Sequence, residues 1–516
     1  MTAAGHAPAA PGAAAPAGTP LVALRSSTGA ALIAATVLAS AVTAVDANVI
    51  KVAVPAIGRS LDAGVTALQW TLTSYLLAVA ALLLLAGALS DRLGRRRLLA
   101  IGLLVMLVAS VLCAVAPSIG VLIAARVVQG IGAALVVPTS LALLNGTLRD
   151  ADRARGIGIW AGLETIGTTA GPYVGGWLVD RGSWRYVFLL SIPLILAGLL
   201  ALRRVPESGR SAGRFSLDAR GALLGVVGLG GVIYALTAGP SSGWLSAPVL
   251  VAAVIGVASL AALVPAERRV RDPMLRLALF ASRQFDAINV VTLVLYGALG
   301  AASYLVILQC ELRLGYSPAQ AGAALIPESL VFLALSPLSG ALVARFSPRW
   351  LMAAGIAAIT AAFFWLSGAH AGQGYASAIL PGALLWGLGI GLAVTPLTAA
   401  VLAAIGDADQ GEASGINDAA SRIGGVVVIA VVPALIGATG GRSYGQALAH
   451  GYQPAMIVMG GLCAVALLIT VVFVGDARPA ARRVIPRVPD GGCAPCVLPP
   501  AGAPEPVSAA GGRDHG

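Results

Sequence analysis

Charged residues are scarce in this chain. Only 11% of its 516 residues are Asp, Glu, Lys or Arg, and 58% are hydrophobic, whereas soluble domains are about one-quarter charged. This composition excludes a water-soluble globule. Apolar runs of about 18 residues or more recur along the chain, and each is typical of a membrane-spanning helix. The sequence therefore predicts an all-α membrane protein with no aqueous segment large enough for a separate soluble enzyme.

Residue types that often carry chemistry are also rare. The chain has four histidines and five cysteines, and their positions indicate no metal cluster. Cys493 and Cys496 form a CxxC, but a CxxC without a second ligand pair is weak evidence for metal or redox chemistry. No nucleophile–base pair is visible either. We therefore expect no enzyme activity, no bound metal and no cofactor.

Lysine is almost absent: Lys51 is the only one, and the other basic residues are arginines. The net charge of +11 does not indicate a nucleic-acid partner, because the arginines lie in short loops between apolar runs. There they set the topology or contact anionic lipid.

Fourteen apolar segments are predicted to span the membrane. Their approximate ranges are 29–56, 67–89, 98–116, 119–144, 156–178, 184–202, 218–238, 246–265, 286–309, 319–344, 350–369, 376–404, 414–438 and 455–475.

Arginines gather in every second loop. By the positive-inside rule, these loops and both termini are predicted to lie in the cytoplasm, and the protein is predicted to span the cell (inner) membrane. The arginine-rich loops follow the even-numbered segments, at 92–97, 149–155, 203–220 and 268–283. Residues 1–28 and 476–516 are expected to be disordered cytoplasmic tails.

An internal repeat divides the chain. GALSDRLGRR (87–96) returns as GALVARFSPR (340–349), and DADRARGIG (150–158) returns as DADQGEASG (407–415). The spacing corresponds to eight spans, as expected for two six-helix halves with two helices inserted between them. The predicted domains are residues 29–203, a linker with two inserted helices at 204–285, and residues 286–475.

The stretch GALSDRLGRRRLL (87–99) has the pattern of a cytoplasmic gate. We expect Gly87 to allow close helix approach, Gly94 to form a tight turn and Asp91 to accept hydrogen bonds from arginines or a helix N-terminus. The alternative is a simple basic anchor. The predicted gate comprises Gly87, Asp91, Arg92, Gly94, Arg95 and Arg96.

Two further segments carry unusual residues for a membrane helix. ARVVQGIGAA (125–134) places Arg126 inside the hydrocarbon, where an arginine needs a partner or water. GTTAGPYVGG (167–176) combines glycines that allow helix contact with a proline that removes a backbone hydrogen bond. Its predicted key residues are Gly167, Gly171, Pro172, Gly175 and Gly176.

Together with DANVIKVAVP (46–55), SWRYVFLLSIP (183–193) and GEASGINDAASRIGG (411–425), these motifs fall in an order that resembles the major facilitator superfamily. The resemblance covers about residues 25–475 and is to the 14-helix drug:proton antiporter family. It implies export of small amphipathic compounds, drugs or a natural product, in exchange for protons by alternating access. It further implies that Arg126 and Asp46 serve proton coupling and that residues 167–176 form the antiporter motif.

Some positions depart from the family pattern. Asn48 replaces a usual threonine and Lys51 a usual asparagine, while Leu384 is the repeat counterpart of Arg126. The second-half echo of the gate has Ala344 and Ser347 in place of an aspartate and a glycine. Proton coupling is therefore expected mainly in the first half.

Four ionisable residues in the spans, together with the polar Asn48, are candidates for the proton or substrate path. Burial raises the pKa of a carboxylate, and a nearby arginine lowers it. A carboxylate between these two effects, such as Asp46 near Arg126, can bind a proton in one state and release it in another. Lys51 lies about 33 Å along its helix, near the edge of a core about 30 Å thick. It either rims the cavity, where it would disfavour cations, or anchors the interface. Glu164 and Glu328 lie in mid-membrane, where acids often mark such paths.

Alternative functions on the same fold are a proton-coupled carrier for a specific polar metabolite and a non-transporting membrane sensor. We expect small-molecule substrates, protons and the lipid bilayer as partners, a proton gradient as the energy source, and a monomer.

Overall fold

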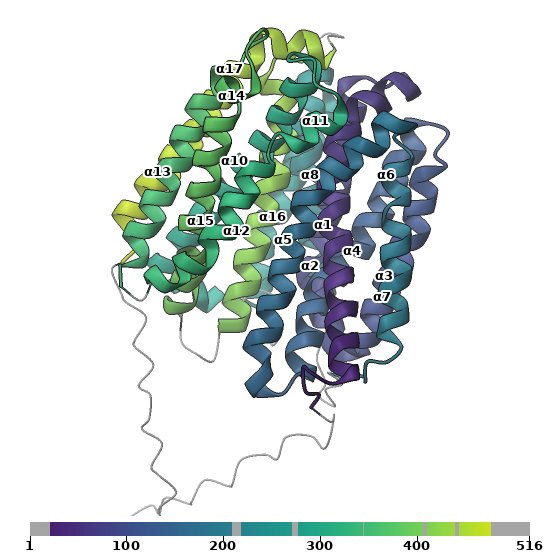
Figure 1. The fold of residues 1–516 in the computed structure, drawn as a ribbon, viewed down its shortest axis with the longest axis vertical. Helices are drawn as coiled ribbons and strands as arrows, with labels where there is room; N and C mark the ends of the chain where they lie inside the picture. Colours follow the sequence, from purple (N-terminus) through teal and green to yellow (C-terminus); the bar gives the residue numbers. More distant parts are fainter. Residues whose placement is uncertain are drawn as a thin grey trace, which may run out of the picture. The chain divides into compact units, whose positions relative to one another are not determined.

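In a computed structural model of the chain, apolar helices from both halves of the sequence lie side by side (Figure 1). The structure describes residues 21–208, 218–270, 277–343, 345–405, 410–438 and 443–475. These residues form helices but no strands; their one extended pairing is an isolated bridge between Val22 and Leu148. Residues 1–20 of the expected N-terminal tail (1–28) lie outside the described residues, as do the expected C-terminal tail (476–516) and its two CxxC cysteines.

The described residues 21–208 form seven helices. They are α1 (Ser27–Leu61), α2 (Val65–Leu93), α3 (Arg95–Ala114), α4 (Ile119–Thr147), α5 (Asp150–Arg181), α6 (Tyr186–Leu189) and α7 (Ser191–Leu202).

The helices α8 (Ala219–Ser242) and α9 (Ala247–Glu267) lie in the segment 204–285 that the sequence assigns to the insert. A 3-10 turn, η1 (Leu277–Ala281), precedes the later helices. These are α10 (Arg283–Leu312), α11 (Pro318–Ala323), α12 (Ile326–Val343), α13 (Pro348–Ser367), α14 (Tyr375–Ala378), α15 (Leu380–Ala403), α16 (Gln410–Leu435) and α17 (Tyr444–Phe473).

Among the described residues, 12 helical segments are long and apolar enough to cross a membrane. The other two of the fourteen predicted spans are also helical, but they are not both long and apolar enough to be counted as membrane-crossing helices. The expected span at 156–178 lies within α5, which is rich in glycine, threonine and charge. The span at 184–202 becomes Tyr186–Leu202, which is shorter than a typical spanning helix. The count of fourteen spans therefore stays a prediction.

Packing follows the sequence order of the two halves. In the first half, α1 packs against α5 and α7, and α2 packs against α4; in the second, α10 packs against α16 and α13 against α15. The insert touches both halves, because α8 contacts α2 and α16. Leu229 and Ile233 of α8 are buried there with Ala80 of α2 and Val426 of α16.

The segment before α1 is held to the connection between α4 and α5, although the sequence places it in a disordered tail. The Val22 N–H donates to the carbonyl of Thr147 at 2.9 Å, and the Arg149 N–H donates to the carbonyl of Val22 at 3.2 Å. We call this end of the bundle, which also carries Gly94–Arg97 and Arg203–Arg204, the arginine-rich end. The opposite end is where α5 ends and α2 begins.

Candidate functional site

A buried carboxylate on α1 lies at the centre of a polar cluster in the first half. Asp46 is only 1% exposed. Its Oδ2 accepts a hydrogen bond from Nε2 of Gln129 on α4 at 2.8 Å. Its Oδ1 accepts one from the hydroxyl of Ser191 at the start of α7. Both carboxylate oxygens are therefore bonded to other helices, as a buried charge requires.

Arg126 of α4 is equally buried, at 1% exposure. Its Nε donates to the carbonyl of Thr71 at 3.0 Å, and its Nη1 donates to Oε1 of Gln129 at 2.7 Å. The guanidinium also lies 4.2 Å from the centre of the Tyr75 ring, a cation–π distance. These contacts fix the charge deep in the helix bundle.

Gln129 joins the two predicted coupling residues. Its amide nitrogen donates to Asp46 while its amide oxygen accepts from Arg126, and no ion pair joins the two charges directly within the described chain. The Gln129 nitrogen also donates to the hydroxyl of Ser110 at 3.0 Å. We call Asp46, Gln129, Arg126 and Ser191 the Asp46 network.

The sequence analysis did not single out Gln129 or Ser191. The sequence does indicate that Gln129 lies near Arg126, because Gln129 follows Arg126 by three residues and residues three apart share one face of a helix. Ser191 lies in the quoted stretch SWRYVFLLSIP, but nothing in the sequence alone shows that it reaches α1. In chemical terms, the network holds one negative and one positive charge through a neutral amide, so adding a proton to Asp46 changes its charge balance.

Lys51 lies between the two halves and not on an outer surface. It is 7% exposed, and its Nζ donates to Oδ1 of Asn48 at 3.0 Å and to the hydroxyl of Ser303 on α10 at 2.7 Å. Glu328 of α12 is close enough for its charge to act on Lys51. A buried ammonium group does not fit the interfacial anchor, and a position at the rim of a cavity stays a prediction.

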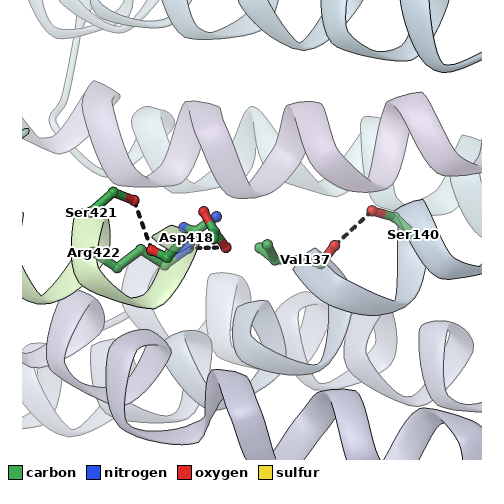
Figure 2. Close-up of polar contacts among 5 residues, drawn as sticks. All are labelled: Val137, Ser140, Asp418, Ser421 and Arg422. Carbon is green, nitrogen blue, oxygen red and sulfur yellow. Dashed lines mark hydrogen bonds and ion pairs between the residues drawn. The ribbon is translucent and has the colours of Figure 1, made fainter. Parts of the chain in front are cut away.

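Glu164 of α5 is half-buried and belongs to a different charged group. The charges of Arg422 and Asp418 on α16 act on it. Asp418 and Arg422 are four residues apart on one face of α16 and form an ion pair, with Nε and Oδ2 3.1 Å apart. Figure 2 shows this pair, together with the Ser421 hydroxyl that donates to the Asp418 carbonyl at 2.7 Å. The mid-membrane acids Glu164 and Glu328 are thus near different cations.

The predicted gate turns within one residue. Gly94 has a φ of +95° between the end of α2 and the start of α3, a conformation that favours glycine. A residue missed by the sequence analysis holds the turn: the Arg96 N–H donates to Oε1 of Glu207 at 2.9 Å, and Arg97 pairs with Oε2 of Glu207 at 3.9 Å. Arg95 Nη1 donates to the carbonyl of Ala142 at 3.0 Å.

One prediction for the gate is wrong. A Cβ built at Gly87 would meet nothing within 4 Å, so this glycine does not mark a close helix contact in the described structure. Arg92 is exposed, and the side chain of Asp91 lies outside the described part of the chain. A gating role for these residues stays a prediction.

The glycine run of α5 packs against α1 with a period of four residues. Gly167, Gly171 and Gly175 face Ala41, Val45 and Val49 in turn. The close helix contact expected from the small residues is therefore present.

The same run also reaches the second half. A Cβ at Gly176 would lie 2.2 Å from the carbonyl oxygen of Pro318 on α11, and a Cβ at Gly322 would lie 2.2 Å from that of Pro172. Because the obstacle is backbone in both cases, a side chain at either position cannot be accommodated by a change of rotamer.

Metal chemistry finds no support in the described residues. They contain no group of three or more His, Cys, Asp or Glu side chains that could hold a metal ion. Cys113, Cys310 and Cys463 are buried free cysteines, as expected for core positions.

Comparisons with curated proteins give named relatives. The chain is 36% identical to the multidrug resistance protein Stp of Mycobacterium tuberculosis (strain CDC 1551 / Oshkosh), over 76% of this chain and 73% of that protein. It is 33% identical to the methylenomycin A resistance protein of Streptomyces coelicolor, over 85% and 91% of the two chains. It is 32% identical to the puromycin resistance protein pur8 of Streptomyces alboniger, over 80% and 82%.

Solved structures agree in fold. A POT family transporter in complex with 5-aminolevulinic acid matches with a TM-score of 0.64 and 16% identity, over 87% of this chain and 96% of that one. A D-xylose–proton symporter matches with a TM-score of 0.62 and 18% identity, over 87% and 98%. The family model "Major Facilitator Superfamily" matches residues 36–428 and 288–509. The chain is thus a multi-pass membrane protein with a transporter fold, and it belongs to the major facilitator superfamily.

Proposed function

We propose that the chain exports small amphipathic compounds, drugs or a natural product, in exchange for protons by alternating access. The observation that carries the proposal is the Asp46 network, an ionisable carboxylate buried among three helices and linked through Gln129 to a buried arginine. Buried ionisable groups inside a membrane bundle commonly mark proton paths. The relatives named for multidrug, methylenomycin and puromycin resistance support efflux as the direction.

The proposal includes the finer predictions on topology. In the proposed topology, fourteen spans form two six-helix halves with α8 and α9 inserted between them. Both termini lie in the cytoplasm, and the arginine-rich end lies on the cytoplasmic face of a cell (inner) membrane. We further propose that the protein works as a monomer, uses the proton gradient as its energy source, and has neither a cofactor nor enzyme activity. The gate at 87–96 would open and close the cytoplasmic end, since a two-state loop must make different contacts in its two states.

A carrier for a specific polar metabolite is the second candidate. Lys51, Asn48 and Ser303 form a polar group between α1 and α10, and Glu164 lies near the Asp418–Arg422 pair. Such groups suit a polar substrate as well as a charged drug.

The test is proton release from acidified everted membrane vesicles that contain the protein, on addition of cationic, neutral and anionic amphipathic compounds. We expect release with several unrelated compounds and none in vesicles without the protein. Release with a single polar compound class would favour the metabolite carrier. Transport of compounds without any proton movement would contradict the proposed antiport.

Charge preference is expected to change in Lys51→Asn. Removal of the ammonium group leaves the nearby Glu328 charge uncompensated, so transport of cationic compounds should rise by roughly tenfold relative to neutral ones, equivalent to about 1.4 kcal/mol. The measurement is the rate of efflux of a cationic and a neutral dye.

The matched control for Lys51→Asn is Arg59→Gln, which removes an exposed cation at the end of the same helix. It should leave the ratio of the two dyes within about twofold, because solvent screens exposed charges. Equal changes in both variants would mean that Lys51 acts only through the general surface charge.

A further inference from the structure

A basic pocket opens at the arginine-rich end, away from the Asp46 network. It has a volume of about 610 Å³, and its walls come from the segment before α1, the start of α3, the α4–α5 connection and the segment after α7. Its described lining holds no acidic residue and four arginines: Arg96, Arg149, Arg203 and Arg204.

The walls of this arginine pocket are fixed to one another. The bridge between Val22 and the α4–α5 connection fixes one side, and the Leu24 N–H donates to Asp152 at 2.9 Å. On the other side, the Arg95 N–H donates to the carbonyl of Ser208 at 3.0 Å. Four arginines from three segments that are distant in sequence are therefore held around one space, which a role in topology alone does not require.

The nearby carboxylates bind backbone N–H groups and Arg97, which does not line the pocket. Asp152 accepts from the Leu24 N–H, and Glu207 accepts from the Arg96 N–H and pairs with Arg97. Within the described chain, no ion pair joins a carboxylate to the guanidinium groups that line the pocket. The start of α1 adds the positive end of a helix dipole, so the pocket is suited to an anion.

Exposed apolar side chains lie on the two helices that end at the pocket, α3 and α7. Leu104 and Val108 of α3 are 49% and 57% exposed, and Leu196 and Leu200 of α7 are 46% and 60% exposed. The two helices contact each other, and each has one end at the pocket. A ligand with a phosphate group and long apolar chains matches both surfaces at once.

We propose that the arginine pocket binds the phosphate-bearing head group of an anionic lipid, whose acyl chains lie along α3 and α7. Guanidinium groups bind phosphate oxygens in pairs of parallel hydrogen bonds. Free phosphate shares the head-group chemistry, but it makes no use of the apolar surface. The site is separate from the Asp46 network, and its occupancy does not depend on the proposed transport reaction.

The test is the affinity of the full-length protein, purified in detergent, for phosphatidylglycerol and phosphatidylcholine, measured by native mass spectrometry. We expect wild type to bind phosphatidylglycerol more tightly than phosphatidylcholine. The double variant R203Q/R204Q should bind phosphatidylglycerol about 25-fold more weakly, from about fivefold for each arginine near a lipid head group. The matched control is R268Q/R269Q, which removes two exposed arginines in tandem just after α9. It should retain the wild-type affinity within about twofold.

Equal weakening in R203Q/R204Q and R268Q/R269Q would overturn the proposal, since it would show attraction by surface charge alone. If inorganic phosphate saturates the pocket and phosphatidylglycerol then has no further effect, the ligand would be free phosphate and the lipid proposal would be wrong. If R203Q/R204Q does not fold, R149Q provides the same test from another wall of the pocket. It should weaken phosphatidylglycerol binding about fivefold, and an unchanged affinity would count against the site.

Discussion

Asp46→Asn is expected to reduce compound-dependent proton release from everted vesicles to the background of vesicles without the protein. Asparagine has nearly the shape of aspartate, and its amide oxygen can still accept from Gln129 or Ser191. It does not take up a proton at neutral pH, however, and it carries no charge to balance Arg126. Exchange of compound down its own gradient should therefore survive better than transport driven by protons, and both are measured in the same vesicles.

Ser110→Ala is the matched control for this prediction. Ser110 accepts from the same Gln129 amide at 3.0 Å, so its loss disturbs the same cluster without touching an ionisable group. Removal of one neutral hydrogen bond costs about 0.5–1.5 kcal/mol, and proton release should fall by less than about tenfold. Full proton release in Asp46→Asn would contradict the assignment and direct attention to Glu164 and Glu328.

Much of the fold follows from the sequence because its determinants are local. Apolar runs form helices wherever they are long enough, and Gly94 turns the chain as its residue type predicts. The burial of Arg126 and Asp46 also follows, since both lie within apolar runs. These conclusions need only the position of a residue within its own helix.

The contacts of the site do not follow from the sequence, because they depend on how helices rotate and tilt against one another. Asp46 and Arg126 lie at compatible depths, which suggests a direct pair, yet the side chain of Gln129 lies between them. Glu207 comes more than 100 residues after the turn that it binds, and no pattern connects the two. From the sequence, Lys51 could face either side of α1. Its hydrogen bond to Ser303 shows that it faces α10.

The two halves are joined by contacts toward the opposite end of the bundle. Asp180, at the end of α5, accepts from the hydroxyl of Ser317 at 2.8 Å and from the Ala319 N–H at 3.1 Å, both at the start of α11. Gln69, near the start of α2, accepts from Tyr444 Oη at 3.0 Å. Under alternating access these contacts must break when this end opens. A close backbone contact of α5 with α11 also joins the halves, because Gly176 lies directly against Pro318.

Gly176→Ala is expected to shift the protein toward a conformation in which α5 and α11 are separated. The new Cβ would lie 2.2 Å from the Pro318 carbonyl oxygen, and overpacking of this kind costs about 1–3 kcal/mol, equivalent to a shift of about 5–150-fold in a two-state equilibrium. The measurement is the distance between spin labels at Arg181→Cys and Gln320→Cys, with Cys493 and Cys496 replaced by serine. The other cysteines are buried.

Gly158→Ala is the control for this shift, because it makes the same change in α5 where a Cβ meets nothing within 4 Å. We expect the population with the longer label distance to rise in Gly176→Ala only, and efflux to fall with it, because a transporter that favours one state completes its cycle more slowly. An unchanged distance with normal efflux would mean that the new methyl group is accommodated without separating α5 from α11. The glycine run would then serve only to pack α5 against α1, and the alternation between states would depend on other contacts.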